Sequence, residues 1–100
     1  MDIPNSYRVG GQVVETQFVE HLDGNLGRCC LGAGWLKIAK IFKEEKQTES
    51  SMFNTFNHEL VHTILDTMGK DELSRDEVFV NTFASFLTES VLSMEFWEDK

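Results

Sequence analysis

Cysteine is scarce in this 100-residue sequence, and no long apolar run is present. The two cysteines, Cys29 and Cys30, are adjacent, which is a poor geometry for a disulfide bond and leaves no second pair to join. A membrane-spanning helix needs about 20 consecutive apolar residues, and no run approaches that length. The first residues, Met1–Pro4, lack the pattern of a secretory signal. These absences argue against a disulfide scaffold and a membrane span, and we expect a cytoplasmic protein.

Positively charged residues are also few. Nine Lys and Arg residues stand against 17 Asp and Glu residues, so the formal net charge is −8 at pH 7 and the pI is near 4.7. Such a chain repels phosphate backbones, and no basic cluster is dense enough to overrule that repulsion. We therefore expect no direct binding to nucleic acid, and a basic protein partner would suit the chain better.

The composition is that of a folded protein. Hydrophobic residues make up 41% of the chain and aromatic residues 11%, which favours a packed globule over disorder. A length of 100 residues is near the commonest domain size and is enough for one core. We predict a single domain over residues 1–100, without a cleft between large lobes.

The segment Thr55–Ile64 contains the spacing His-Glu-x-x-His. On a helix, at about 100° per residue, His58 and His62 stand one turn apart on the same face, so their rings can converge on one metal ion. Glu59 projects beside them, where it can reach a water bound to that metal and act as general base in peptide hydrolysis. The spacing predicts a two-histidine zinc site with Glu59 as the catalytic residue.

The residues around this motif also follow the pattern of metallopeptidase helices. Thr55 lies three places before His58, the intervening positions are uncharged, and Ile64 is the apolar residue six places beyond it. The alternative interpretation is two core or surface histidines with an accidental glutamate. We take the core stripe of this helix to be Phe53, Leu60, Ile64 and Met68. The histidines then lie roughly 150° from the centre of that stripe, where a pair packed only as core would not be found.

Turn residues and apolar patterning divide the rest of the chain. We expect strands over residues 7–14, with a glycine bulge or tight bend at Gly10-Gly11, over 26–31 and over 35–42. The segment 15–22 has both helical and strand spacing, and we favour extended structure there. Because the connections are short, an antiparallel meander of three strands is the economical assembly. Helical spacing predicts two long helices over residues 50–68 and 76–96, joined closely enough to pack as an antiparallel pair. The predicted fold class is α+β: a three-stranded antiparallel sheet followed by two long helices, the first carrying His-Glu-x-x-His.

Two histidines do not complete a catalytic zinc site, which usually has three protein ligands and a water. Glu77 is the candidate third ligand, because it lies near the start of the second helix. Along the helix axes it is level with His62 only if this second helix starts near Asp71. Asn81, one turn later on the same face, could orient a histidine ligand. One alternative stays open: Ser74 caps the second helix, and Glu77 is its partner in a Ser-x-x-Glu capping box.

These residues resemble a known group of enzymes. The His-Glu-x-x-His helix followed by Glu77-x-x-x-Asn81 looks like the gluzincin arrangement, whose second motif is Glu-x-x-x-Asp. The segment 77–84 is similar to the motif that follows the zinc helix in the ImmA/IrrE family of phage and bacterial metallopeptidases. In size and layout the chain also resembles small phage and prophage zinc-metallopeptidase-like proteins, which begin with a Gly-Gly strand such as Tyr7–Gly11.

The resemblance implies a minimal zincin-like domain. It implies Zn²⁺ as the cofactor, held by His58, His62 and Glu77, and a residue at position 81 that braces a histidine. It also implies a protein substrate, such as a regulatory phage repressor. Asn81 departs from the family's aspartate, although its amide oxygen can still accept a hydrogen bond from a histidine N–H.

The leading hypothesis is a zinc-dependent metallopeptidase that binds its substrate along an exposed sheet edge. An alternative is a non-catalytic, zinc-stabilised interaction protein of phage or prophage origin, although such a site has no use for Glu59. A third interpretation, a domain without metal, requires the whole motif to be accidental. Tyr7 and His21 are the nominal candidates for stabilising an oxyanion. The ligand set also accommodates manganese, iron or cobalt, and the sequence indicates no oligomeric state.

Overall fold

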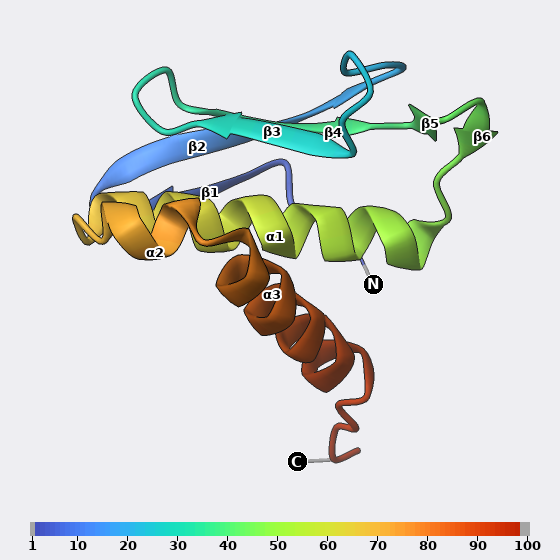
Figure 1. The fold of residues 1–100 in the computed structure, drawn as a ribbon. Coiled ribbons are helices and arrows are strands. Elements are labelled where there is room, and N and C mark those ends of the chain that lie inside the picture. The colour runs from blue at the N-terminus through green and yellow to red at the C-terminus, as the bar shows by residue number, and fades with distance from the viewer. Residues whose placement is uncertain (1, 99–100) are drawn as a thin grey trace.

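The computed structural model describes residues 2–98, which form a sheet, a helix beneath it and a further helix beyond that (Figure 1). The sheet contains β1 (Ser6–Val9), β2 (Gln12–Val19), β3 (Gly27–Cys30) and β4 (Trp35–Ala39). A ribbon of β5 (Ile41–Phe42) and β6 (Glu45–Lys46) leads into α1 (Glu49–Thr67). The short α2 (Asp71–Arg75) then connects α1 to α3 (Glu77–Leu92). The α+β fold class is as predicted.

The sheet is mixed, and the predicted three-stranded antiparallel meander is wrong. Its strand order is β1-β2-β4-β3, in which β2 and β4 are parallel and the other pairs are antiparallel. Leu36, Ile38 and Ala39 of β4 are fully buried. An interior position suits such an apolar strand, so β4 lies between β2 and β3. The less apolar β3, which begins with Gly27 and Arg28, is left at the edge.

Several predicted strand limits also need correction. The segment 7–14 is two strands rather than one, because Gly10 and Gly11 form the turn of a hairpin in which Val9 pairs with Gln12. Both glycines have positive φ, 56° and 83°, as a two-residue turn of type I′ requires. The segment 35–42 is interrupted at Lys40, between β4 and β5.

The helix limits were predicted more closely. Thr48 caps α1 by accepting a hydrogen bond of 3.1 Å from the Ser51 backbone N–H. Gly69, at φ 74°, follows the end of the helix and turns the chain away. The expected pair of long helices is present as α1 and α3, but α2 was not anticipated, and α3 ends at Leu92 rather than at residue 96. Within residues 2–98, no helix is long and apolar enough to cross a membrane.

Helix α1 packs on both of its sides. Between α1 and the sheet, the buried cluster consists of Val14, Leu36, Ile38, Phe53 and Phe56. Between α1 and α3, it consists of Val61, Leu65, Val80 and Ala84. Ile64 and Met68, which were assigned to the core stripe, are 39% and 61% exposed, so that assignment is wrong. With two faces covered, a third face of α1 is left between β3 and α3.

Candidate metal centre

The two histidines of the motif lie on the third face of α1, between β3 and α3. The Nε2 atoms of His58 and His62 are 3.2 Å apart. Their ring centroids are 4.9 Å apart, in an edge-to-face arrangement. Both side chains are largely buried yet reach solvent. Because the two histidines are one helical turn apart, their Nε2 atoms lie close enough to bind the same ion, as the spacing predicts.

Glu77, the first residue of α3, reaches the same point. Its carboxylate oxygens lie 3.3 Å from His58 Nε2 and 3.1 Å from His62 Nε2. The second long helix, α3, begins at Glu77 rather than near Asp71, so the condition set for Glu77 to reach His62 was wrong. The short helix α2 (Asp71–Arg75) precedes it, and Glu77 reaches the histidines from the first position of α3. The capping-box alternative is not formed, because Asp76 caps α3 by accepting a 3.1 Å hydrogen bond from the Phe79 N–H.

The spacing of these three side chains fits a zinc ion. A tetrahedral zinc with bonds of about 2.0–2.1 Å to nitrogen and oxygen holds neighbouring ligand atoms roughly 3.3 Å apart. The two histidine Nε2 atoms are 3.2 Å apart, Glu77 Oε2 lies 3.3 Å from His58 Nε2, and Glu77 Oε1 lies 3.1 Å from His62 Nε2. In the part of the chain that the structure describes, this is the one group of His, Cys, Asp and Glu side chains close enough to hold an ion.

Ser74, which the sequence offered only as a possible helix cap, lies at the site. It is buried in α2, and its Oγ lies 3.0 Å from His62 Nδ1. Binding a metal through Nε2 leaves the proton of a neutral imidazole on Nδ1, which then donates to Ser74 Oγ. Asn81, predicted to orient a histidine, lines the adjoining cavity. Within residues 2–98 it makes no hydrogen bond to His58 or His62, so its bracing role stays a prediction.

Glu59 is buried beside the two histidines. It is 7% exposed, and its Oε2 lies 4.0 Å from His58 Nε2. Burial raises the pKa of this carboxyl group, His58 and a hydrogen bond from the Cys29 thiol oppose the rise, and the charge of Glu77 adds to it. A carboxylate with a raised pKa accepts a proton more readily near neutral pH, which is what a general base needs.

Cys29 faces α1 from β3, where it pairs with Leu36. Burial raises the pKa of its thiol, and the neighbouring Glu59 carboxylate raises it further. The thiol therefore stays protonated at neutral pH. It can donate a hydrogen bond to Glu59, and it lacks the thiolate character of a metal ligand.

The site opens into a cavity of about 470 Å³ between β3, α1 and α3. Gly27 lines it where β3 passes over α1. A Cβ atom at this position would lie 2.6 Å from Thr55 Cγ2 and 3.2 Å from Glu59 Cγ. Only glycine lets the strand approach the Glu59 side chain so closely.

Neither nominal oxyanion residue lines this cavity. The Tyr7 hydroxyl lies 2.8 Å from Thr63 Oγ1, and its ring packs edge-on against Phe56, within the core beneath the sheet. His21 lies outside the cavity lining as well. The amide groups at the cavity wall come instead from Asn25, Asn54 and Asn81.

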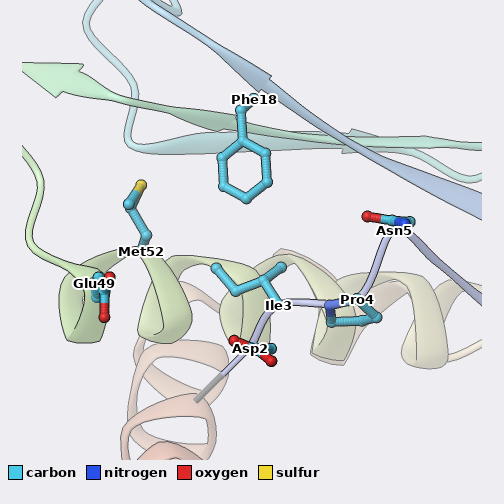
Figure 2. A pocket seen from close by; sticks show the side chains of 7 residues that line it. All are labelled: Asp2, Ile3, Pro4, Asn5, Phe18, Glu49 and Met52. Carbon is cyan, nitrogen blue, oxygen red and sulfur yellow. The ribbon is translucent and has the colours of Figure 1, made fainter.

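A second cavity, of about 490 Å³, lies near the start of α1. Figure 2 shows Phe18 of β2 pointing towards α1, with Ile3 and Met52 beside it and the carboxylates of Asp2 and Glu49 at the rim. Its lining contains no histidine or cysteine. The first cavity, which contains the three converging ligands, is therefore the candidate functional site.

No protein-family model matches the sequence, and neither a curated protein nor a solved structure matches the chain. The chemistry of the site is therefore the evidence for function.

Proposed function

We propose that this protein is a zincin-like, zinc-dependent metallopeptidase, with His58, His62 and Glu77 as ligands and Glu59 as general base. The observation that carries the proposal is the convergence of two histidine nitrogens, 3.2 Å apart, with the Glu77 carboxylate, one oxygen of which lies 3.3 Å from His58 Nε2 and the other 3.1 Å from His62 Nε2. A buried carboxylate stands beside them, with Glu59 Oε2 4.0 Å from His58 Nε2. A site that only binds metal has no use for this fourth group.

In the proposed reaction, each side chain has a separate task. His58, His62 and Glu77 would hold a zinc ion, which would lower the pKa of a bound water towards about 7. Glu59 would accept a proton from that water as it attacks the peptide carbonyl, and would then donate the proton to the leaving amine. Ser74 Oγ holds the His62 ring through Nδ1. Gly27 keeps β3 close over Glu59, which limits the access of bulk water to the base.

The free edge of β3 is the proposed substrate-binding element. The Ala39 N–H donates a 2.9 Å hydrogen bond to the Leu26 carbonyl. Because bonding alternates along an antiparallel pair, the backbone N–H and C=O groups of Gly27 and Cys29 point outwards. An extended peptide can pair with them as an added strand beside the metal site. The family resemblance suggests a regulatory protein, and the acidic chain suits a basic segment of it.

The second candidate function is a zinc-stabilised interaction protein without catalysis. One observation favours it: the ligands come from α1 and α3, so a bound ion would join the two helices. The buried Glu59 weighs against it, because a buried carboxylate costs stability that a structural site would not need to lose.

The test is a digest of a diverse peptide library by tag-free, zinc-loaded protein, read by mass spectrometry. We expect cleavage by the native chain and by Glu89→Gln, which changes an exposed carboxylate of α3 outside the site. Glu59→Gln should lose activity by about 100-fold or more while it keeps its zinc. No cleavage by the zinc-loaded native chain would contradict the enzyme and favour the interaction protein. Undiminished cleavage by Glu59→Gln would trace the activity to a contaminant.

A further inference from the structure

Three polar side chains form a hydrogen-bonded chain between α1 and α3. Asn57 Nδ2 donates a 2.9 Å hydrogen bond to Thr88 Oγ1. The Thr88 hydroxyl lies 2.9 Å from Asn54 Oδ1 and 2.8 Å from the Ala84 carbonyl, and it donates to these two acceptors. Asn57 is 3% exposed and Thr88 is 8% exposed, whereas Asn54 is partly exposed and lines the cavity of the metal site. The buried polar chain therefore ends at the wall of that cavity.

These contacts fix the orientation of the Asn54 amide group. Because its Oδ1 accepts from Thr88, the two N–H donors of Nδ2 lie on the other side of the amide. Nδ2 makes no hydrogen bond within residues 2–98. Asn54 lies one helical turn before His58 on the same face of α1, and both residues line the cavity. The fold thus leaves an oriented and unused donor about one turn from the histidines.

The other amide and hydroxyl donors of the cavity wall are either occupied or unrestrained. Asn25 Nδ2 donates at 3.1 Å to a backbone carbonyl of its own turn. The Thr55 hydroxyl donates at 3.0 Å to a backbone carbonyl one turn earlier in α1. Asn81 is exposed, and its side chain makes no hydrogen bond within residues 2–98. A donor that is held in place beforehand binds a ligand at a lower entropic cost, so Asn54 is the donor best suited to a ligand.

The charge of the cavity favours a neutral acceptor as that ligand. Glu59 and Glu77 line the cavity, and none of its described lining residues is Lys or Arg. These carboxylates disfavour an anionic ligand at Asn54. A peptide carbonyl is a neutral acceptor. In an extended peptide paired with the edge of β3, every second carbonyl points away from β3 and is free to accept a hydrogen bond from another element.

We propose that Asn54 binds a backbone carbonyl of the peptide in the cavity, and that Thr88 is the positioning residue that orients its amide. The inference rests on the proposed function for the peptide nature of the ligand, but it does not require catalysis, because a peptide bound without cleavage would make the same contact. The buried pair of Asn57 and Thr88 is then part of the peptide site as well as a link between two helices.

The test is peptide binding to the full, zinc-loaded chain in which Glu59→Gln prevents cleavage. The probe is a fluorescein-labelled ten-residue peptide, selected from a random library for binding to this chain, and fluorescence anisotropy gives its Kd. Adding Asn54→Ala should raise the Kd by about 10-fold, the size expected for one lost hydrogen bond. The matched control is Asn5→Ala, which changes an exposed asparagine outside the cavity and should leave the Kd unchanged. Zinc content should be the same in all of these chains.

Two further changes separate a donor from a structural residue. Asn54→Asp keeps an oxygen for Thr88 but replaces both N–H donors with a second acceptor, so we expect a loss at least as large as that of Asn54→Ala. In the peptide, replacing one backbone amide by an ester weakens the adjoining carbonyl as an acceptor. At one position of the peptide, this replacement should weaken binding when Asn54 is present and have little effect once Asn54→Ala is introduced.

The role of Thr88 is tested by the same coupling. Thr88→Val removes the hydroxyl that holds Asn54 and should reduce the coupling to the ester, whereas Thr88→Ser keeps the hydroxyl and should preserve it. Circular dichroism shows that each variant is folded. Undiminished coupling in Thr88→Val would contradict the positioning role.

The proposal is overturned if Asn54→Ala binds the peptide as Asn5→Ala does, if Asn54→Asp binds as tightly as the chain with Asn54, or if the ester couples to Asn54 at no position. Any of these results, with a native chain that cleaves peptides, would leave the peptidase intact. Conversely, the expected losses of binding with a native chain that cleaves nothing would support the Asn54 contact and contradict catalysis alone. A library that yields no binding peptide would overturn the peptide site itself.

Discussion

A single serine holds one of the two histidines in place. Ser74 is buried in α2, and its Oγ lies 3.0 Å from His62 Nδ1. That contact orients the ring, and when Nδ1 is the donor it leaves Nε2 free for the proposed ion, as the outer partners of metal-binding histidines do. It also makes α2, an element without metal ligands, part of the site.

Replacement of this serine should weaken metal binding without abolishing it. We expect Ser74→Ala to lower zinc affinity by about 10- to 100-fold, because the His62 ring loses its hydrogen-bond partner. Titration against a chromophoric chelator measures the change. Ser85→Ala, at an exposed position of α3, is the matched control and should bind as the native chain does. Equal affinities for the two variants would show that Ser74 does not orient the ligand.

The buried carboxylate of Glu59 should destabilise the protein when no metal is bound. Burial raises the pKa of its carboxyl group, so the folded state holds the proton more tightly than the unfolded state does. The folded state therefore loses stability as the pH rises from the pKa of Glu59 in the unfolded chain to its higher pKa in the folded chain. Glu59→Gln removes the charge, and we expect it to stabilise the metal-free chain at pH 7 by on the order of 1 kcal/mol, a common size for changes at functional residues.

This gain should vanish in acid. Below the unfolded pKa, for which the ordinary value is 4.5, native Glu59 is protonated in both states and the variant has no advantage. Urea denaturation at several pH values, with EDTA present, measures the effect. A stabilisation that is equally large at low pH would assign it to packing rather than to the buried charge.

Much of the site could be predicted from single residues. His58 and His62 converge because helical geometry fixes the direction of residues four apart, and Glu77 was found by its position at the start of the next helix. Ser74 was missed because Ser-x-x-Glu is also the signature of a capping box. Asp76, two residues later, is equally good as a cap and occupies that role. Local spacing cannot decide between two such caps.

At the scale of elements, the position of β3 over α1 determines the shape of the cavity. A Cβ at Gly27 would stand 2.6 Å from Thr55 Cγ2, so the strand lies where only glycine fits. Because Gly27 also lies beside Glu59, any shift of β3 changes the distance between the proposed substrate edge and the general base.

We therefore expect Gly27→Ala to destabilise the protein by about 1–3 kcal/mol, as overpacking does, and to lower peptidase activity. Thr55→Ser removes the clashing methyl group and keeps the hydroxyl, so the double variant should recover much of the stability. Gly32→Ala is the control, since a Cβ there meets nothing within 4 Å. Thermal melts of the four proteins measure the effect. No difference between Gly27→Ala and Gly32→Ala would contradict the close approach.

The elements that were predicted wrongly depend on contacts between distant residues. Extended structure was predicted in the right regions, but strand limits and strand order were not. β3 lies between β2 and β4 in the sequence, yet it occupies the edge of the sheet while β2 and β4 pair in parallel. The core stripe of α1 was misassigned for a related reason. The helix faces the sheet on one side and α3 on the other, so its apolar residues do not follow the single stripe expected of a surface helix. Val61 and Leu65 are buried, while Met68 is not.

At the scale of the whole molecule, the metal would join two parts of the fold. The core between α1 and α3 is small, consisting of Val61, Leu65, Val80 and Ala84. Zinc bound by two ligands from α1 and one from α3 would add a link between these helices. Ligands that bind only the folded state stabilise it, by about 4 kcal/mol at a thousandfold excess over the dissociation constant.

Zinc should therefore raise the melting temperature of the native chain, and EDTA should reverse the rise. Glu77→Gln removes the ligand from α3, so most of the increase should be lost, whereas Glu89→Gln on the same helix should keep it. Differential scanning calorimetry with and without zinc makes the comparison. An increase as large in Glu77→Gln as in the native chain would show that zinc does not link α1 to α3.

The most direct test of the three-ligand zinc site is the metal content of tag-free protein, measured by elemental mass spectrometry after zinc is offered and excess is removed. The site geometry predicts about one zinc per chain, abolished in His58→Ala, much reduced in Glu77→Ala and unchanged in Glu89→Ala. A native chain that retains no zinc would contradict the metal centre and the peptidase proposed from it.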